Sequence, residues 1–220
     1  MLKSVIKDVF SKMVNIVSKI KNKILSCLLK IICVYRIKES KSVYLTFDDG
    51  PEPGITEFVL DNLKNYHIKA TFFCLGDNIE RNRDLFDQIV REGHSIGSHT
   101  ISHLKGDEVS IKAYCNEVKS FIEKYHYKLF RPPHGVLTLI QLIKVSFLVG
   151  KSHIIMWTVD STDWYHKPAS DFDLISITNR IKPGSIILLH CCKKHEERTR
   201  IILPLLLEDL SNKNFTFDKL

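Results

Sequence analysis

Two histidines and two aspartates carry the clearest chemical signal in the sequence. His99 and His103 stand four residues apart, a spacing at which two imidazoles on one helical turn can bind a single metal ion. Asp48 and Asp49 follow an apolar run, and adjacent carboxylates repel each other unless a cation or an arginine neutralises one of them. Alone, either pair also fits surface histidines or an ordinary Asp-Gly turn. Together they form a two-histidine, one-carboxylate set with open positions, which predicts a catalytic divalent metal.

Further residues could handle charge and protons. Arg131 precedes a rigid Pro-Pro turn, and its guanidinium could hold a neighbouring carboxylate ionised. Asp160 and Asp163 supply two more carboxylates, next to the aromatic ring of Trp164. His190 ends an apolar run and is suited to proton transfer near neutral pH, although a histidine at a strand end is more often structural.

The elements that must position these residues follow from the pattern after residue 42, where short β-rich runs alternate with helical ones. This alternation is typical of an α/β domain with a largely parallel sheet. Strands are predicted at 43–47, 70–75, 95–97, 128–131, 154–159, 186–189 and 215–217. Helices are predicted near 55–66, 80–92, 110–126, 137–149, 170–181 and 199–212. The candidate residues each follow the carboxyl end of a strand, the edge at which such folds build active sites.

The positive charge of the chain is confined to its first part. Of the net +7 over 220 residues, residues 1–41 contribute +8, from nine lysines and Arg36 against Asp8 and Glu39. The rest of the chain is therefore close to neutral, which argues against a nucleic-acid-binding domain. We divide the chain into a basic leader at 1–41 and one catalytic domain at 42–220.

The leader is predicted to be an amphipathic helix, because its apolar residues recur at steps of three and four. They are Leu2, Ile6, Val9, Met13, Ile16, Ile20, Ile24, Cys27, Ile31 and Val34. The stretch 24–35 is too short for a membrane span and contains Lys30. Residues 1–38 could lie on an anionic membrane surface, or the helix could pack on the body or pair as a coiled coil. An uncleaved or atypical export signal also stays open.

The remaining histidines and cysteines are expected to be structural. His94 precedes the strand at 95–97, so it should lie at the opposite end from His99. The six cysteines form no CxxC pair, and we expect reduced thiols, with Cys191 and Cys192 unsuited to act as a metal-binding pair.

Five segments, in this order, resemble the motifs of the polysaccharide deacetylases, carbohydrate esterase family 4. They are Thr46-Phe47-Asp48-Asp49-Gly50, His99-Thr100 with His103, Arg131-Pro132-Pro133-His134-Gly135, Asp160 with Asp163-Trp164, and Leu188 with His190. The resemblance covers residues 42–220 and implies a distorted, incomplete (β/α) barrel. It also implies metal-dependent hydrolysis of an N-acetyl group on an amino sugar of a polysaccharide or oligosaccharide.

The resemblance also implies roles for individual residues. Asp49, His99 and His103 correspond to the metal ligands, usually of Zn²⁺, with Co²⁺, Mn²⁺ or Ni²⁺ as alternatives. Asp48 corresponds to the base that activates water, and His190 to the acid that protonates the leaving amine.

The other motif residues correspond to supporting groups. Asp163 would orient His190, and Arg131 would tether the catalytic base. A backbone N–H near His134 would stabilise the oxyanion, while Trp164 and Leu188 would enclose the acetyl methyl group.

Two positions depart from the family pattern, and two other functions stay open. His134 stands where tyrosine is common, and Cys191 where aspartate is frequent. The alternatives are a deacylase or deformylase of a lipid-linked amino sugar and a non-catalytic carbohydrate-binding relative. We expect an N-acetylated glycan substrate, no nucleic acid partner, and a place at the membrane or cell envelope rather than free in the cytoplasm.

Overall fold

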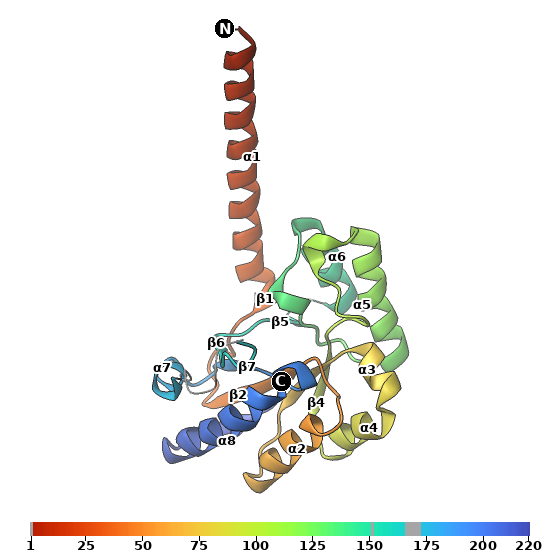
Figure 1. Ribbon diagram of the computed structural model, residues 1–220, viewed down its shortest axis with the longest axis vertical. Coiled ribbons are helices and arrows are strands. Elements are labelled where there is room, and N and C mark those ends of the chain that lie inside the picture. Colours follow the sequence, from red (N-terminus) through yellow and green to blue (C-terminus); the bar gives the residue numbers. More distant parts are fainter. Residues whose placement is uncertain (1, 151, 166–172) are drawn as a thin grey trace.

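A sheet of parallel strands forms the centre of the computed structural model, which describes residues 2–150, 152–165 and 173–220 (Figure 1). The strand order is β4-β3-β2-β7-β6, and β8 also pairs with β2. The bounds are β2 (Ser42–Asp48), β3 (Thr71–Cys74), β4 (Ser95–Ser98), β6 (Val159–Asp160), β7 (Ile186–His190) and β8 (Thr216–Asp218). β2 is buried along almost its whole length, as expected of a central parallel strand covered on both faces.

A second strand pair extends this sheet into part of a ring. β1 (Cys33–Val34) pairs in parallel with β5 (Ile154–Ile155). Phe130 forms parallel bridges to both Ser98 and Ile154, so it links β4 to β5. The strands thus curve round as a distorted, incomplete barrel, and the predicted α/β class is confirmed.

Helices cover the outside of this barrel (Figure 1). They are α2 (Ile55–Asn65), α3 (Gly76–Arg81), α4 (Arg83–Arg91), α5 (Ile111–Tyr125), α6 (Leu139–Val149), α7 (Leu174–Thr178) and α8 (Glu196–Asn212), with short 3₁₀ turns η1 (Gly106–Glu108), η2 (Pro133–Gly135) and η4 (Lys193–His195). The main core lies between the sheet and the apolar faces of α2, α4 and α8. A second core, around Phe130 and Ile154, lies under α5 and α6. Capping fixes where α6 begins, since Thr138 and Gln141 form a reciprocal capping box.

Three predicted helices differ clearly in extent from those of the structure. The helix predicted at 80–92 is two helices, interrupted at Asn82, whose side-chain amide donates to the carbonyls of Pro51 and Asn78. The last helix begins at Glu196, three residues earlier than predicted, and continues through Pro204. Of the helix predicted at 170–181, residues 170–172 lie outside the described residues and the rest contains the short α7.

Two predicted strands are wrong in extent, and Arg131 explains one of them. The run at 154–159 is interrupted between β5 and β6, where the carbonyls of Ile155 and Met156 accept from the Arg131 guanidinium. The Met156 N–H donates instead to Val34 of β1. The strand predicted at 128–131 is reduced to the two isolated bridges of Phe130.

The leader forms helix α1 (Leu2–Ile32), which extends away from the body (Figure 1). Its C-terminal part docks through apolar residues that pack on the second core: Leu25, Leu28, Leu29 and Ile32. The predicted stripe does not form the docking face where its side chains are described, since Ile20, Ile24 and Ile31 are 54%, 46% and 72% exposed. The side chains of its members at 2, 6, 9, 13 and 16 lie outside the described part of the chain. Val34 belongs to β1 rather than to a helical stripe, contrary to the prediction. Within the described chain, no helix combines the length and apolarity that a membrane crossing requires.

Gly97 of β4 offers a test of how tightly the sheet supports the site. A Cβ at this position would lie 2.5 Å from two ring carbons of Phe73. The centroid of that ring lies 4.2 Å from the guanidinium carbon of Arg131. We expect Gly97→Ala to lower the free energy of unfolding by about 1–3 kcal/mol, since overpacking displaces buried groups. Urea unfolding measures this, with Ser95→Ala in the same strand as the control. Equal stability of the two variants would contradict the described packing.

Candidate active site

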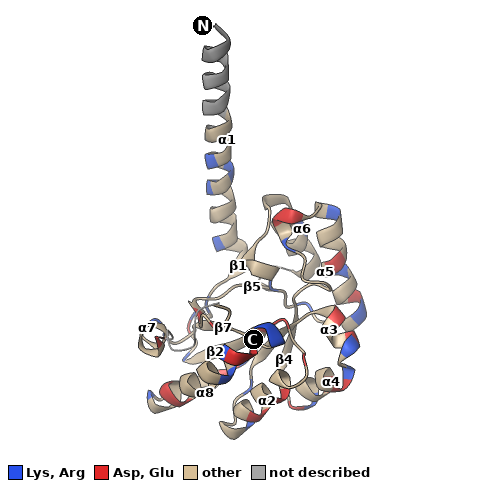
Figure 2. Cartoon of the chain, in the orientation of Figure 1, with Lys and Arg blue, Asp and Glu red and all other residues tan. Residues whose placement is uncertain are grey.

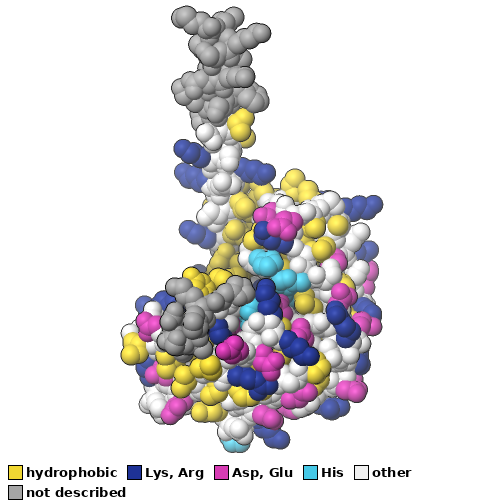
Figure 3. Space-filling view, viewed as in Figure 1, with side chains coloured by type: hydrophobic (Ala, Val, Ile, Leu, Met, Phe, Trp, Pro, Cys, Tyr) yellow, Lys and Arg dark blue, Asp and Glu magenta, His cyan; other side chains and the backbone are white. Residues whose placement is uncertain are grey.

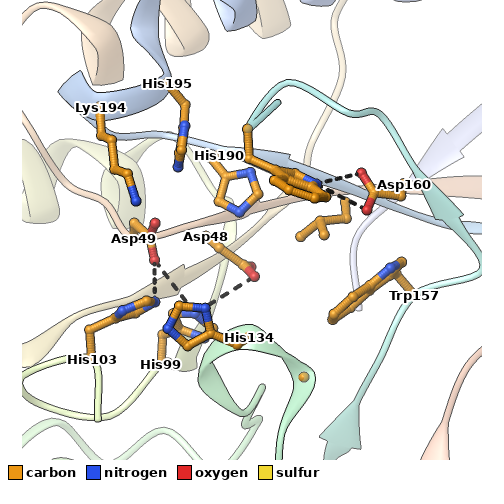
Figure 4. Close-up of a pocket in the computed structure, with 13 residues that line it drawn as sticks. Asp48, Asp49, His99, His103, His134, Trp157, Asp160, His190, Lys194 and His195 are labelled. Carbon is orange, nitrogen blue, oxygen red and sulfur yellow. Dashed lines mark hydrogen bonds and ion pairs between the residues drawn. The ribbon is translucent and has the colours of Figure 1, made fainter. Parts of the chain in front are cut away.

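The chemically active side chains gather around one cavity of about 240 Å³ at the carboxyl ends of β2, β4 and β7 (Figure 4). It is lined by Asp48, Asp49, His99, His103, His134, Gly135, Trp157, Asp160, Trp164, Leu188, His190, Lys194 and His195. In the space-filling view, histidine side chains gather in a hollow of the body near lysines (Figure 3). The cavity contains eight of the ten predicted site residues, and the other two, Arg131 and Asp163, lie buried behind it.

Three ligand-type side chains converge on one point of this cavity. The Nε2 atoms of His103 and His99 lie 3.2 and 3.5 Å from Asp49 Oδ1. That oxygen is buried and has no hydrogen-bond partner among the described residues. His99 is oriented from behind by a 2.8 Å contact between Nδ1 and the carbonyl of Arg131, which leaves Nε2 facing the cavity. Converging nitrogens and an unpartnered buried oxygen fit a divalent cation.

The electrostatics of these groups favour the protonation states that metal binding needs. Burial would raise the pKa of Asp49, but the contact with His103 and the charges of the neighbouring histidines hold it well below its usual range. Burial lowers the pKa of His99, although the neighbouring carboxylates oppose this. An ionised carboxylate beside a neutral imidazole is the combination that ligates a metal ion.

Asp48 is held by a buried arginine. Its Oδ1 accepts from Arg131 Nη1 at 2.8 Å, while Oδ2 lies 3.8 Å from His99 Nε2. Arg131 is fully buried, and its other donors go to Thr46 Oγ1 and to the carbonyls of Ile155 and Met156. The guanidinium therefore holds Oδ1 of Asp48 in a hydrogen bond, and the other carboxylate oxygen, Oδ2, faces His99.

His190 faces the cavity from the side opposite His99 and His103 (Figure 4). Asp163 contacts its ring from behind. Its Nδ1 lies 2.8 Å from Asp163 Oδ1, and its backbone N–H donates to Oδ2 at 2.6 Å. The hydroxyl of Thr199 also donates to Oδ2. Burial would lower the pKa of His190, but the charge and hydrogen bond of Asp163 raise it to about 9. His190 is thus kept protonated at neutral pH.

This pair leads to a prediction about pH dependence. Asp163→Asn removes the negative charge that raises the His190 pKa, so His190 should lose its proton at lower pH than in the wild type. We expect the alkaline limb of the pH profile of kcat to move to lower pH if protonated His190 is required. Asp160→Asn is the control, because that carboxylate accepts from Trp164 and not from His190. The same shift in both variants, or in neither, would contradict the assignment.

The predicted wall residues His134, Trp164 and Leu188 line the same cavity. Leu188 is buried, and Trp164 is anchored by 3.0 Å contacts between Nε1 and both oxygens of Asp160. His134 stands in η2 with a left-handed backbone, its ring 4.7 Å from that of His103. Burial and the charge of His103 lower its pKa.

Sequence reasoning missed three residues of the cavity wall. Trp157 lies in the interruption between β5 and β6 and faces Gly135, where a Cβ would come within 2.8 Å of its ring. Lys194 and His195 belong to η4, which begins at Lys193, three residues after His190. Their place shortly beyond a strand end, the criterion that selected the other candidates, was the available signal for these two. Trp157 fell inside the strand predicted at 154–159, so this criterion did not select it.

The structural assignments of His94 and Cys191 hold. His94 is buried at the other end of the sheet, where Nδ1 accepts from the Ala70 N–H and burial lowers its pKa to about 4. All six cysteines are free. Cys191 packs into the main core with its Sγ 3.3 Å from Thr56 Oγ1. The departure from the family pattern at this position therefore leaves the Asp163–His190 contact in place.

The comparisons with known proteins agree with this site. A profile described as "Polysaccharide deacetylase" matches residues 36–142. A peptidoglycan-N-acetylglucosamine deacetylase of Bacillus cereus is 34% identical, over 80% of this chain and 85% of that protein. A chitooligosaccharide deacetylase of Bradyrhizobium is 33% identical, over 70% of this chain and 72% of its own length.

A solved structure extends the similarity to the fold. A peptidoglycan N-acetylglucosamine deacetylase, crystallised with a naphthyl-substituted N-hydroxybenzamide, has a TM-score of 0.76 and 32% identity. The match covers 89% of this chain and 94% of that one. The motif residues gather in one cavity, and these relatives match over most of their length. The chain therefore belongs to the polysaccharide deacetylase family.

Proposed function

We propose that the chain is a metal-dependent hydrolase that removes N-acetyl groups from amino sugars of a cell-envelope glycan. One observation carries the proposal: a buried, unpartnered Asp49 oxygen faces two imidazoles, with a tethered carboxylate on one side and a protonated histidine on the other. Amide hydrolysis needs this combination, because water must be activated and an amine must leave protonated.

Asp49, His99 and His103 would hold the metal, and we propose Zn²⁺. Two nitrogens and one carboxylate oxygen are a common catalytic zinc set, and three protein ligands leave a position open. When bound, such an ion lowers the pKa of water and polarises an amide carbonyl.

Asp48 would act as the base. Its Oδ1 is committed to Arg131, so Oδ2 is the oxygen available to take the proton of the attacking water. Arg131 fixes the orientation of this carboxylate through the hydrogen bond to Oδ1.

His190 would donate a proton to the departing amine. Its Nδ1 is oriented by Asp163, so its Nε2 proton faces the cavity. The oxyanion would be stabilised by the backbone N–H of His134. In this turn the N–H groups of Gly135 and Val136 already donate to Pro132 and Pro133. Trp164 and Leu188 would enclose the methyl group.

The substrate proposal rests on the relatives, two of which are named for action on peptidoglycan or chitooligosaccharide. We propose peptidoglycan as the main substrate and the cell envelope as the location. The test is acetate release by the metal-loaded protein from isolated peptidoglycan, soluble chito-oligosaccharides and a lipid-linked N-acetylated sugar. Fastest release from peptidoglycan supports the proposal, whereas release from the lipid-linked sugar alone supports the alternative deacylase.

We also propose that α1 lies on an anionic membrane surface. The exposed apolar side chains of Ile20, Ile24 and Ile31 and the lysines among them support this proposal (Figure 2). Flotation with anionic and with neutral vesicles tests it. Glutamate in place of Lys19, Lys21 and Lys23 should abolish binding to anionic vesicles, and equal binding by this variant would contradict the proposal. Truncation through residue 38 is a poorer test, because it removes β1.

A further inference from the structure

Two ligand-type side chains outside the proposed mechanism, Cys192 and His195, meet on the far side of Asp49. Cys192 Sγ donates to Asp49 Oδ2 at 3.6 Å, and His195 completes a group whose ligand atoms all lie within 4.8 Å of one another. Cys192 is buried, and the His195 ring points into the cavity near Asp49 (Figure 4). Neither residue belongs to the family motifs identified in the sequence.

The local fold explains why these two side chains share a side. Cys192 is the N-cap of the 3₁₀ turn η4 and His195 its last residue, and side chains three residues apart eclipse in a 3₁₀ helix. The turn is fixed by bonds from the His195 N–H to the Cys192 carbonyl and from the Lys193 N–H to Glu52. The Thr199 hydroxyl oxygen of α8 lies 3.0 Å from the His195 carbonyl oxygen. Backbone hydrogen bonds therefore hold the turn in which Cys192 and His195 both face Asp49.

From this geometry we propose a second cation site, formed by Asp49 Oδ2, Cys192 and His195, for Zn²⁺ or another borderline-soft divalent ion. Sulfur, nitrogen and oxygen ligands together select such ions. In a tetrahedral zinc site, sulfur and oxygen ligands lie about 3.5 Å apart, close to the separation of Cys192 Sγ and Asp49 Oδ2.

Asp49 would bridge the two sites. Its Oδ1 faces His99 and His103 while its Oδ2 faces Cys192, and paired metal ions about 3.5–4 Å apart share ligands in this way. The second site shares Asp49 with the proposed catalytic ligands but does not depend on deacetylase activity.

The second ion would bind more weakly and would inhibit. Lys194 lines the same cavity, and the His190 ring lies 4.9 Å from that of His195, so two cationic groups oppose a further positive charge. An ion at this position would also lie on the same side of the cavity as His190. Excess zinc is therefore expected to slow the enzyme.

Titration with Co²⁺ under reducing conditions tests the proposal directly. The ligands of the first site include no sulfur, so a thiolate-to-Co²⁺ charge-transfer band in the near ultraviolet reports only the second site. We expect the band in the wild type, its loss in Cys192→Ser and its retention in Cys27→Ser, which removes an exposed cysteine on α1. We also expect weaker Co²⁺ binding in His195→Ala, measured from the same band.

The outcomes separate this site from the proposed function. Absence of the band in the wild type, its persistence in Cys192→Ser, or unchanged affinity in His195→Ala would overturn the second site. Circular dichroism confirms that each variant is folded. Because the band needs no turnover, it supports the site even if no acetate is released, and acetate release without the band would leave the deacetylase intact.

Discussion

Replacing Asp48 by asparagine is expected to lower kcat for acetate release by about 10²–10⁴-fold, the usual contribution of a general base. The amide oxygen can still accept from Arg131 at the position of Oδ1, so the site should keep its shape. Asp48 is not among the proposed metal ligands, so bound metal should stay at the wild-type level. Steady-state kinetics with metal analysis of the same sample measure both effects.

The Asp48→Asn result has a matched control in the same cavity. Asp160→Asn also removes a carboxylate, but one that contacts Trp164 and not the histidines. It should affect kcat far less. Wild-type turnover by Asp48→Asn would contradict the base assignment, and loss of the metal from this variant would show that Asp48 is a ligand.

Replacing His99 by alanine is expected to remove the metal itself. Loss of an outer contact to a metal-binding histidine already weakens affinity by about 10–100-fold, so loss of the ligand should exceed that. Acetate release should then fall to the level of the chelated wild type. Competition with a chromogenic chelator measures the affinity.

His94→Ala provides the control, because His94 is also buried but lies at the opposite end of the sheet. This variant should lose some stability with its Ala70 contact and keep its metal. Retention of tight metal binding by His99→Ala would contradict the proposed ligand set.

The position of the site could be predicted from the sequence because strand ends and short-range spacing determine it. Asp48, Asp49 and His190 end or follow strands of one parallel sheet, so the fold alone brings them to one edge. His99 and His103 are close in sequence, and they do converge, but from a loop with left-handed backbone at Thr100 and His103 rather than from the helical turn that their spacing suggested. These groups indeed line one cavity.

The remaining features depend on contacts between distant segments, which no local pattern encodes. The interruption that exposes Trp157 exists because Arg131 takes the carbonyls of Ile155 and Met156. His195 reaches the cavity through the 3₁₀ turn after β7, next to Cys191 and Cys192, for which the sequence suggested only reduced thiols. In α1 the periodicity correctly predicted a helix. Which face of the helix docks depends on the second core, against which Leu25 and its neighbours pack, and the periodicity does not contain that information.

The central claim is tested most directly by acetate release from peptidoglycan before and after the metal is removed. We expect the metal-loaded protein to release acetate in step with the appearance of free amines, the chelated protein to release none, and added Zn²⁺ to restore the activity. Equal release by chelated and loaded protein would contradict a metal-dependent mechanism. Binding to the glycan without acetate release by the loaded protein would identify a non-catalytic relative.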